Sequence, residues 1–134
     1  GPVGDVSYVD STGTSHSLTW RDFISILNAH LTGSPTLGVA EDRLLGQWFV
    51  KPKELDGRGI PEKVLLYLWD DLLRHEGRAH VFDSGTTGNV RTYGDLVIEA
   101  TAGRRFLSDS FLGKLNAASE IAAEQPGEPD NDAL

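Results

Sequence analysis

Apolar residues recur at helical spacing in two long stretches of the chain. In residues 19–31 they follow one another at intervals of three and four, and Thr19 with Asp22 has the pattern of a helix N-cap. In residues 60–75 the same spacing has further apolar residues on its flanks, so this helix needs neighbours on more than one side. We expect the inner faces of both helices to form the core. Their members are Trp20, Phe23 and Leu27 in the first helix and Leu65, Leu68, Trp69 and Leu72 in the second, flanked by Val64, Leu66 and Leu73.

Pro61 and Gly77 mark the expected ends of the second helix. A proline is tolerated in the first turn of a helix, and a glycine commonly follows the last turn. Trp69 is the largest side chain on the inner stripe of this helix. We therefore expect it to lie at the centre of the core and to contact Trp20 or Phe23 of the first helix.

A short apolar segment between the two helices also belongs to the expected core. Residues 44–50 are too apolar for a surface loop, and residues 39–45 have the pattern of a short helical turn. We expect the segment to dock between the two long helices. The residues predicted to make this contact are Leu44, Leu45, Trp48, Phe49 and Val50.

Short runs bounded by turn-forming residues predict the β-structure. Two strand-like runs flank the turn-rich residues 10–14 and predict a hairpin, and residues 79–82 are a further strand candidate. Runs this short form strands only where another segment pairs with them. The sequence therefore predicts one or two short β-hairpins or strand pairs.

Two further helices are predicted in the last third of the chain. Thr92 and Asp95 have the spacing of an N-cap, and Gly103 stands where that helix would end. A last helix is predicted to begin near Ser108 or Ser110. The expected fold is therefore a small, mainly α domain of about four helices.

Composition divides the chain into three predicted regions. Residues 1–4 open with Gly-Pro and lack a methionine, which is typical of a linker left by tag removal, so we expect a fragment of a longer protein. Residues 5–124 hold the periodic apolar positions and are predicted to be one helical domain. Residues 125–134 combine acidic residues with proline and glycine, which predicts a disordered acidic tail.

The charge distribution argues against direct binding to nucleic acid. The net charge is −8, and the last twenty residues supply −5 of it because they contain five acidic residues and no Lys or Arg. Arg104 and Arg105 are the only adjacent basic pair, whereas a phosphate-binding surface needs a concentrated basic patch. The chain has no cysteine and no apolar run long enough to span a bilayer. We expect a cytoplasmic protein without a membrane segment.

Neither a nucleotide site nor a metal site is predicted from these residues alone. The chain contains no phosphate loop of the form Gly-x-x-x-x-Gly-Lys-Ser/Thr, so it cannot by itself cradle a nucleoside triphosphate. His75 and His80 are five residues apart, which is a wrong spacing for two ligands on one helix face. We therefore expect no enzymatic activity, no cofactor and no metal ion in this fragment.

The order of the motifs resembles the C-terminal part of McrB-like AAA+ NTPases, the motor subunits of modification-dependent restriction systems. The resemblance lies in "EDRLLGQWF", then "KVLLYLWDDLLRHEGRAHVF", then "TYGDLV", and covers roughly residues 18–98. It implies a lid-type domain whose parent binds Mg-NTP through residues upstream of the matched segment. It also implies three partners: the AAA+ core of the same chain, neighbouring ring subunits and a nuclease subunit. The lid would couple nucleotide state mechanically to them.

Arg43 is the candidate for nucleotide sensing within this resemblance. It precedes Leu44 and Leu45 near a predicted helical turn, from which a cation can reach a γ-phosphate held by the motor core. The alternative is an exposed arginine paired with Glu41 or Asp42, because surface pairs are common. Many members of the family have His-Ser or Pro after the glycine that Gln47 follows here, which leaves the choice between GTP and ATP open.

A second function from a different class fits the same pattern. The chain can be a stand-alone helical module that binds a partner protein through an apolar surface, without any NTPase core. A reading frame that continues upstream with a phosphate loop and an Asp-Glu box would favour the lid. A frame that starts near residue 3 would favour the module.

Overall fold

The structure is a computed structural model of the chain. It describes residues 4–33, 44–46, 49–55, 59–74, 77–85 and 88–124, with side chains described up to residue 118. Arg43 and Trp48 therefore lie outside the described residues, as do the predicted helical turn before Leu44 and the predicted tail.

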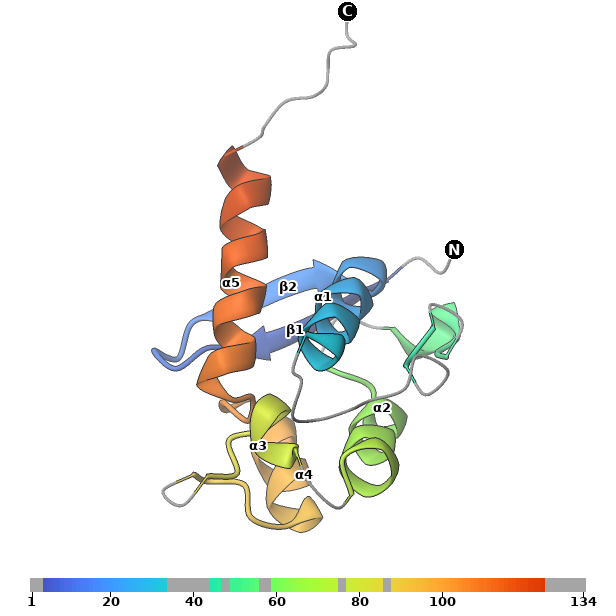
Figure 1. Ribbon diagram of the computed structural model, residues 1–134, viewed down its shortest axis with the longest axis vertical. Coiled ribbons are helices and arrows are strands. Elements are labelled where there is room, and N and C mark those ends of the chain that lie inside the picture. Colours follow the sequence, from blue (N-terminus) through green and yellow to red (C-terminus); the bar gives the residue numbers. More distant parts are fainter. Residues whose placement is uncertain are drawn as a thin grey trace, which may run out of the picture.

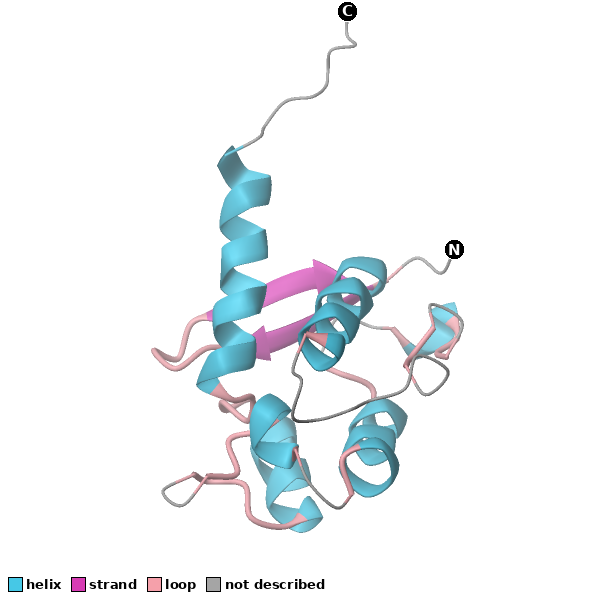
Figure 2. Ribbon diagram, in the orientation of Figure 1, coloured by secondary structure: helices cyan, strands magenta, loops and turns pink. Residues whose placement is uncertain are grey.

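Five α-helices and one β-hairpin make up the described part of the chain (Figure 1, Figure 2). This confirms the prediction of a mainly α fold with a short hairpin. The elements are β1 (Asp5–Val9), β2 (Ser15–Thr19), α1 (Trp20–Thr32), a 3-10 turn (Pro52–Glu54), α2 (Glu62–Leu66), a π-helix (Tyr67–Leu72), α3 (Arg78–Val81), α4 (Tyr93–Thr101) and α5 (Asp109–Glu124).

The hairpin leads directly into α1. Strands β1 and β2 pair antiparallel, with Val6 opposite Leu18 and Tyr8 opposite His16. Val6 and Tyr8 are buried, so one face of the hairpin faces the core. The Thr19 side chain then accepts a hydrogen bond from the Asp22 amide, as the N-cap pattern predicts. The predicted hairpin and first helix are both present.

The second long helix changes its winding halfway along. After α2 the chain continues as the π-helix, in which the Leu73 amide donates to the Leu68 carbonyl at 2.9 Å. Leu68 and Leu73 are buried and Leu72 is half-buried, whereas Leu66 is 47% exposed. Leu66 was expected on the buried flank, and this prediction is wrong, because the neighbours of this helix leave that side open.

The helix also ends earlier than the glycine pattern predicts. The π-helix ends at Leu72, and Gly77, with φ +94°, stands directly before α3. A residue of the next helix stabilises this end: Arg78 Nε donates a hydrogen bond to the Trp69 carbonyl at 2.9 Å. A side chain six residues after the last residue of the π-helix therefore stabilises the helix end, a role that the sequence pattern assigned to a terminal glycine.

The strand predicted at residues 79–82 is a helical turn instead. Residues Arg78–Val81 form α3, and only Phe82 makes a single antiparallel bridge, to Leu107. A mostly apolar run of only four residues does not distinguish a strand from a buried helical turn. Here the Phe82 amide donates to the Arg78 carbonyl at 2.7 Å, so the helical form already satisfies the backbone.

Three helices meet at His30 of α1. The ring of Phe111 on α5 lies 5.8 Å from the ring of Phe23 and 5.2 Å from that of His30, both on α1. His30 Nε2 also donates to the His80 carbonyl in α3 at 2.7 Å, and Ser108 Oγ donates to the same carbonyl at 2.9 Å. In Figure 1, α5 accordingly runs beside α1 and α3.

A capping box fixes the start of α4. Thr92 Oγ1 accepts from the Asp95 amide at 3.0 Å, and Asp95 Oδ2 accepts from the Thr92 amide at 3.2 Å. At the other end Gly103 has φ +73°, the left-handed conformation that the sequence pattern predicts after this helix.

We expect Thr92→Ala to lower the free energy of unfolding by roughly 1 kcal/mol, because the Asp95 amide loses the hydroxyl that accepts its hydrogen bond. Urea denaturation followed by circular dichroism measures the change. Thr92→Ser is the matched control, since it keeps the hydroxyl and should stay close to the parent. Equal stability of Thr92→Ala and the parent would mean that water replaces the cap at no cost.

Candidate functional site

Most residues predicted as core or site residues lie inside the described part of the chain. Trp20, Phe23, Leu27, Leu65, Leu68 and Trp69 are buried, and Phe49 and Leu72 are half-buried. The ring of Trp69 lies 5.5 Å from that of Phe82, and the guanidinium of Arg78 lies 4.2 Å above it. The ring of Trp20 stacks on Phe23 at 6.1 Å.

The described residues that follow Arg43 contact both long helices. Leu45 is buried, and its carbonyl accepts a hydrogen bond from Asn28 Nδ2 of α1 at 2.7 Å. Further along, the ring of Phe49 lies 5.3 Å from that of Tyr67, on the second long helix. The segment therefore contacts α1 through Leu45 and the second long helix through Phe49.

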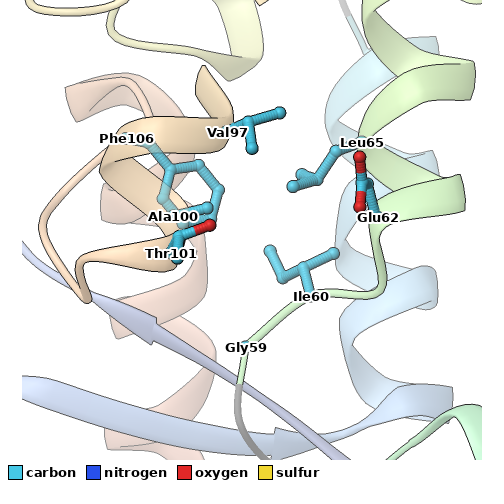
Figure 3. Close-up of a pocket in the computed structure, with 8 residues that line it drawn as sticks. All are labelled: Gly59, Ile60, Glu62, Leu65, Val97, Ala100, Thr101 and Phe106. Atoms are coloured by element: carbon cyan, nitrogen blue, oxygen red, sulfur yellow. The ribbon is translucent and has the colours of Figure 1, made fainter. Parts of the chain in front are cut away.

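A groove lies between α2 and α4 on the described surface (Figure 3). Its volume is about 170 Å³. The apolar side chains that line it extend toward one another from both helices and from the segments beside them. The lining residues are Gly59, Ile60, Glu62, Leu65, Val97, Ala100, Thr101 and Phe106.

One carboxylate stands at the mouth of this groove. Glu62 is exposed, and its Oε2 accepts a hydrogen bond from the Tyr93 hydroxyl at 3.3 Å. Burial of Tyr93 and the neighbouring Glu62 charge together raise the pKa of the tyrosine above its usual value. The contact bridges the N-terminal ends of α2 and α4.

The hairpin turn holds a second polar cluster. Asp10 Oδ1 accepts from the Thr12 and Thr14 amides at 2.9 and 3.0 Å, and Oδ2 accepts from His16 Nε2 at 2.7 Å. Hydrogen bonds from Thr12 and His16 hold the pKa of Asp10 well below its usual range. The ring of Tyr8 stacks on His16 at 5.2 Å. All of these contacts close the turn, so we assign the cluster a structural role.

The adjacent basic pair is engaged by acidic side chains. Arg104 Nε donates to Glu99 Oε1 at 2.9 Å, and Arg105 Nη2 donates to Asp109 Oδ1 at 2.8 Å and lies 3.7 Å from Asp83 Oδ1. The acidic partners neutralise much of the positive charge of the two guanidinium groups, whereas phosphate binding needs a concentrated positive charge.

No group of three or more His, Asp or Glu side chains placed to hold a metal ion occurs among the described residues. Within the same ranges, none of the helices has the length and apolar character needed to cross a bilayer.

The groove was not predicted from the sequence. Its lining comes from residues 59–65 and 97–106, which are far apart in the chain. The one available signal is Glu62, a carboxylate next to an apolar helix face, and an acid in the first turn of a helix is common for a different reason, its interaction with the helix dipole.

One known protein supplies a link to function. The chain is similar to the Bacillus subtilis (strain 168) protein described as the type II restriction enzyme BsuMI component YdiS. The two sequences are 33% identical over 75 residues, which is 55% of the chain. The chain spans only about a fifth, 21%, of the length of that protein. No protein-family description and no solved structure matches the chain. The similarity associates the chain with restriction systems.

Proposed function

We propose that the chain is the C-terminal lid of a McrB-like AAA+ restriction NTPase and is catalytically inert by itself. The observation that carries the proposal is the similarity to a restriction-enzyme component over 75 residues. The order of the three sequence motifs and the small helical fold also support it. The parent protein would bind Mg-GTP or Mg-ATP through its upstream core.

The packing of the described residues suits a lid that acts mechanically. The hydrogen bond between Asn28 and the Leu45 carbonyl ties the segment next to Arg43 to α1. The His30 contact to the His80 carbonyl ties α1 in turn to α3. In the proposed mechanism, a shift of Arg43 on nucleotide binding moves this connected body. The body then presents a changed surface to the AAA+ core, the ring neighbours and a nuclease subunit.

The isolated chain should neither hydrolyse nor measurably bind nucleotides, because it lacks the glycine-rich amides and the lysine that cradle phosphates. Isothermal titration calorimetry with Mg-GTP and with Mg-ATP tests this. Saturable binding with a dissociation constant below about 100 μM would contradict the lid function, since that affinity needs several good contacts.

Arg43 distinguishes a sensing lid from a passive one. In the longer protein, Arg43→Ala should slow NTP hydrolysis by a factor of about 10³ or more if the guanidinium stabilises the transferring phosphoryl group. Lys53→Ala is the matched control, because Lys53 is exposed on the 3-10 turn. An unchanged hydrolysis rate would assign Arg43 to a surface ion pair.

A further inference from the structure

We propose that the groove between α2 and α4 binds an amphipathic segment of another protein chain, which inserts one large apolar side chain and places a lysine or arginine against Glu62. The proposal goes beyond the lid function and does not depend on it, since it uses only the groove.

The floor of the groove selects an apolar group. Ile60, Leu65 and Phe106 are buried, and Val97 and Ala100 close the α4 side (Figure 3). The volume of about 170 Å³ is close to that of an apolar cavity which takes up a benzene-sized group. One leucine, isoleucine or phenylalanine side chain fits such a space. The apolar side chains of the lining offer no hydrogen bonds to water, so displacing water from them favours binding.

Glu62 selects the charge beside that apolar group. Among the described residues it makes no ion pair with a Lys or Arg, and its recorded contact is the Tyr93 hydroxyl. The neighbouring charges are already paired: Lys63 lies 3.5 Å from Glu54, and Glu99 binds Arg104. Glu62 is therefore the carboxylate left to receive a cation at the groove mouth. The net charge of −8 also attracts a basic partner from a distance.

Two exposed apolar side chains lie on the same two helices as the groove. In the described part of the chain the exposed large hydrophobic residues are Leu66, 47% exposed, and Ile98, 58% exposed. Leu66 belongs to α2 and Ile98 to α4, the helices that contribute Leu65 and Val97 to the lining. Leu66 is also one turn beyond Glu62, so the helix presents an acid and a leucine side by side. An amphipathic segment with an apolar residue and a base one turn apart is complementary to this surface.

Selection from a library of helical peptides displayed on phage tests the proposal. The full chain is the bait, and enriched peptides are synthesised and titrated by fluorescence anisotropy. We expect them to share a large apolar residue with a lysine or arginine one helical turn away. Replacing either residue in the peptide by alanine should weaken binding at least tenfold. Enriched peptides that lack this pair, or no enrichment at all, would overturn the proposal.

Two variants of the chain then locate the binding site. Thr101→Trp fills the groove from an exposed position and should abolish binding. Glu62→Lys should weaken the basic peptide at least tenfold and favour the matched peptide in which Glu replaces the base. Asp5→Lys, the same charge change on the exposed start of β1, should leave both affinities unchanged. Thermal unfolding verifies that each variant is folded. Binding that survives Glu62→Lys without a change in charge preference would place the peptide elsewhere.

Analytical ultracentrifugation of the chain alone tests whether a second copy of the chain occupies the groove instead. We expect a monomer across the concentrations used for binding. A dimer that Thr101→Trp dissociates would mean that a second copy of the chain occupies the groove, and the proposed partner would be wrong. Neither peptide binding nor sedimentation uses a nucleotide. A groove that binds no peptide and a chain that is not a lid are therefore separate results.

Discussion

Trp69→Ala should lower the free energy of unfolding by about 3 to 5 kcal/mol, enough to unfold much of a domain of ordinary stability. The indole is 5% exposed, and its ring lies 5.5 Å from that of Phe82. Removing it leaves a cavity between the π-helix and α3. It also removes the aromatic face over which the Arg78 guanidinium lies at 4.2 Å. Urea denaturation measures the loss.

Leu66→Ala is the matched control for Trp69→Ala, because Leu66 lies on the same continuous helix but is 47% exposed. It should change stability by no more than about 0.5 kcal/mol. Tryptophan fluorescence gives an independent readout: with Trp20 and Trp48 replaced by Phe, the remaining Trp69 should emit at short wavelength and resist quenching. Red-shifted, freely quenched emission with an unchanged melting curve would place Trp69 on an interaction surface.

The helices were predictable because their signals are local. The apolar spacing of residues 20–31 and the Thr19 cap both lie within one element, and the structure has that helix. The same holds for Thr92, Asp95 and Gly103 around α4. In each case, the residues that determine the conformation are within a few positions of the backbone that they stabilise.

The errors arise where distant residues decide the outcome. The end of the second helix depends on Arg78, which reaches back nine residues to the Trp69 carbonyl. The exposure of Leu66 depends on which elements cover the helix, and spacing alone does not specify that. The link from His30 to the His80 carbonyl spans fifty residues and leaves no pattern in the sequence.

The groove was missed for a related reason. Its two walls are ordinary amphipathic helices, and an incompletely filled contact between them depends on side-chain volumes at Ala100 and Val97 rather than on periodicity. The sequence was informative about which residues are apolar, and the structure was needed to find where two apolar faces fail to close on each other.

Phe111→Ala should also cost about 3 to 5 kcal/mol, because Phe111 is fully buried and joins two helices. Its ring contacts both Phe23 and His30, at 5.8 and 5.2 Å. Phe111→Leu separates the contribution of buried volume from that of the ring contacts. It keeps most of the apolar volume and loses the ring contacts, so we expect the free energy of unfolding to fall by only about 1 kcal/mol. Lys114→Ala, on the exposed side of α5, is the control and should be nearly neutral. If Phe111→Ala is as mild as Lys114→Ala in urea denaturation, α5 does not contribute to the cooperative core, and the domain is held together by α1 and the second long helix alone.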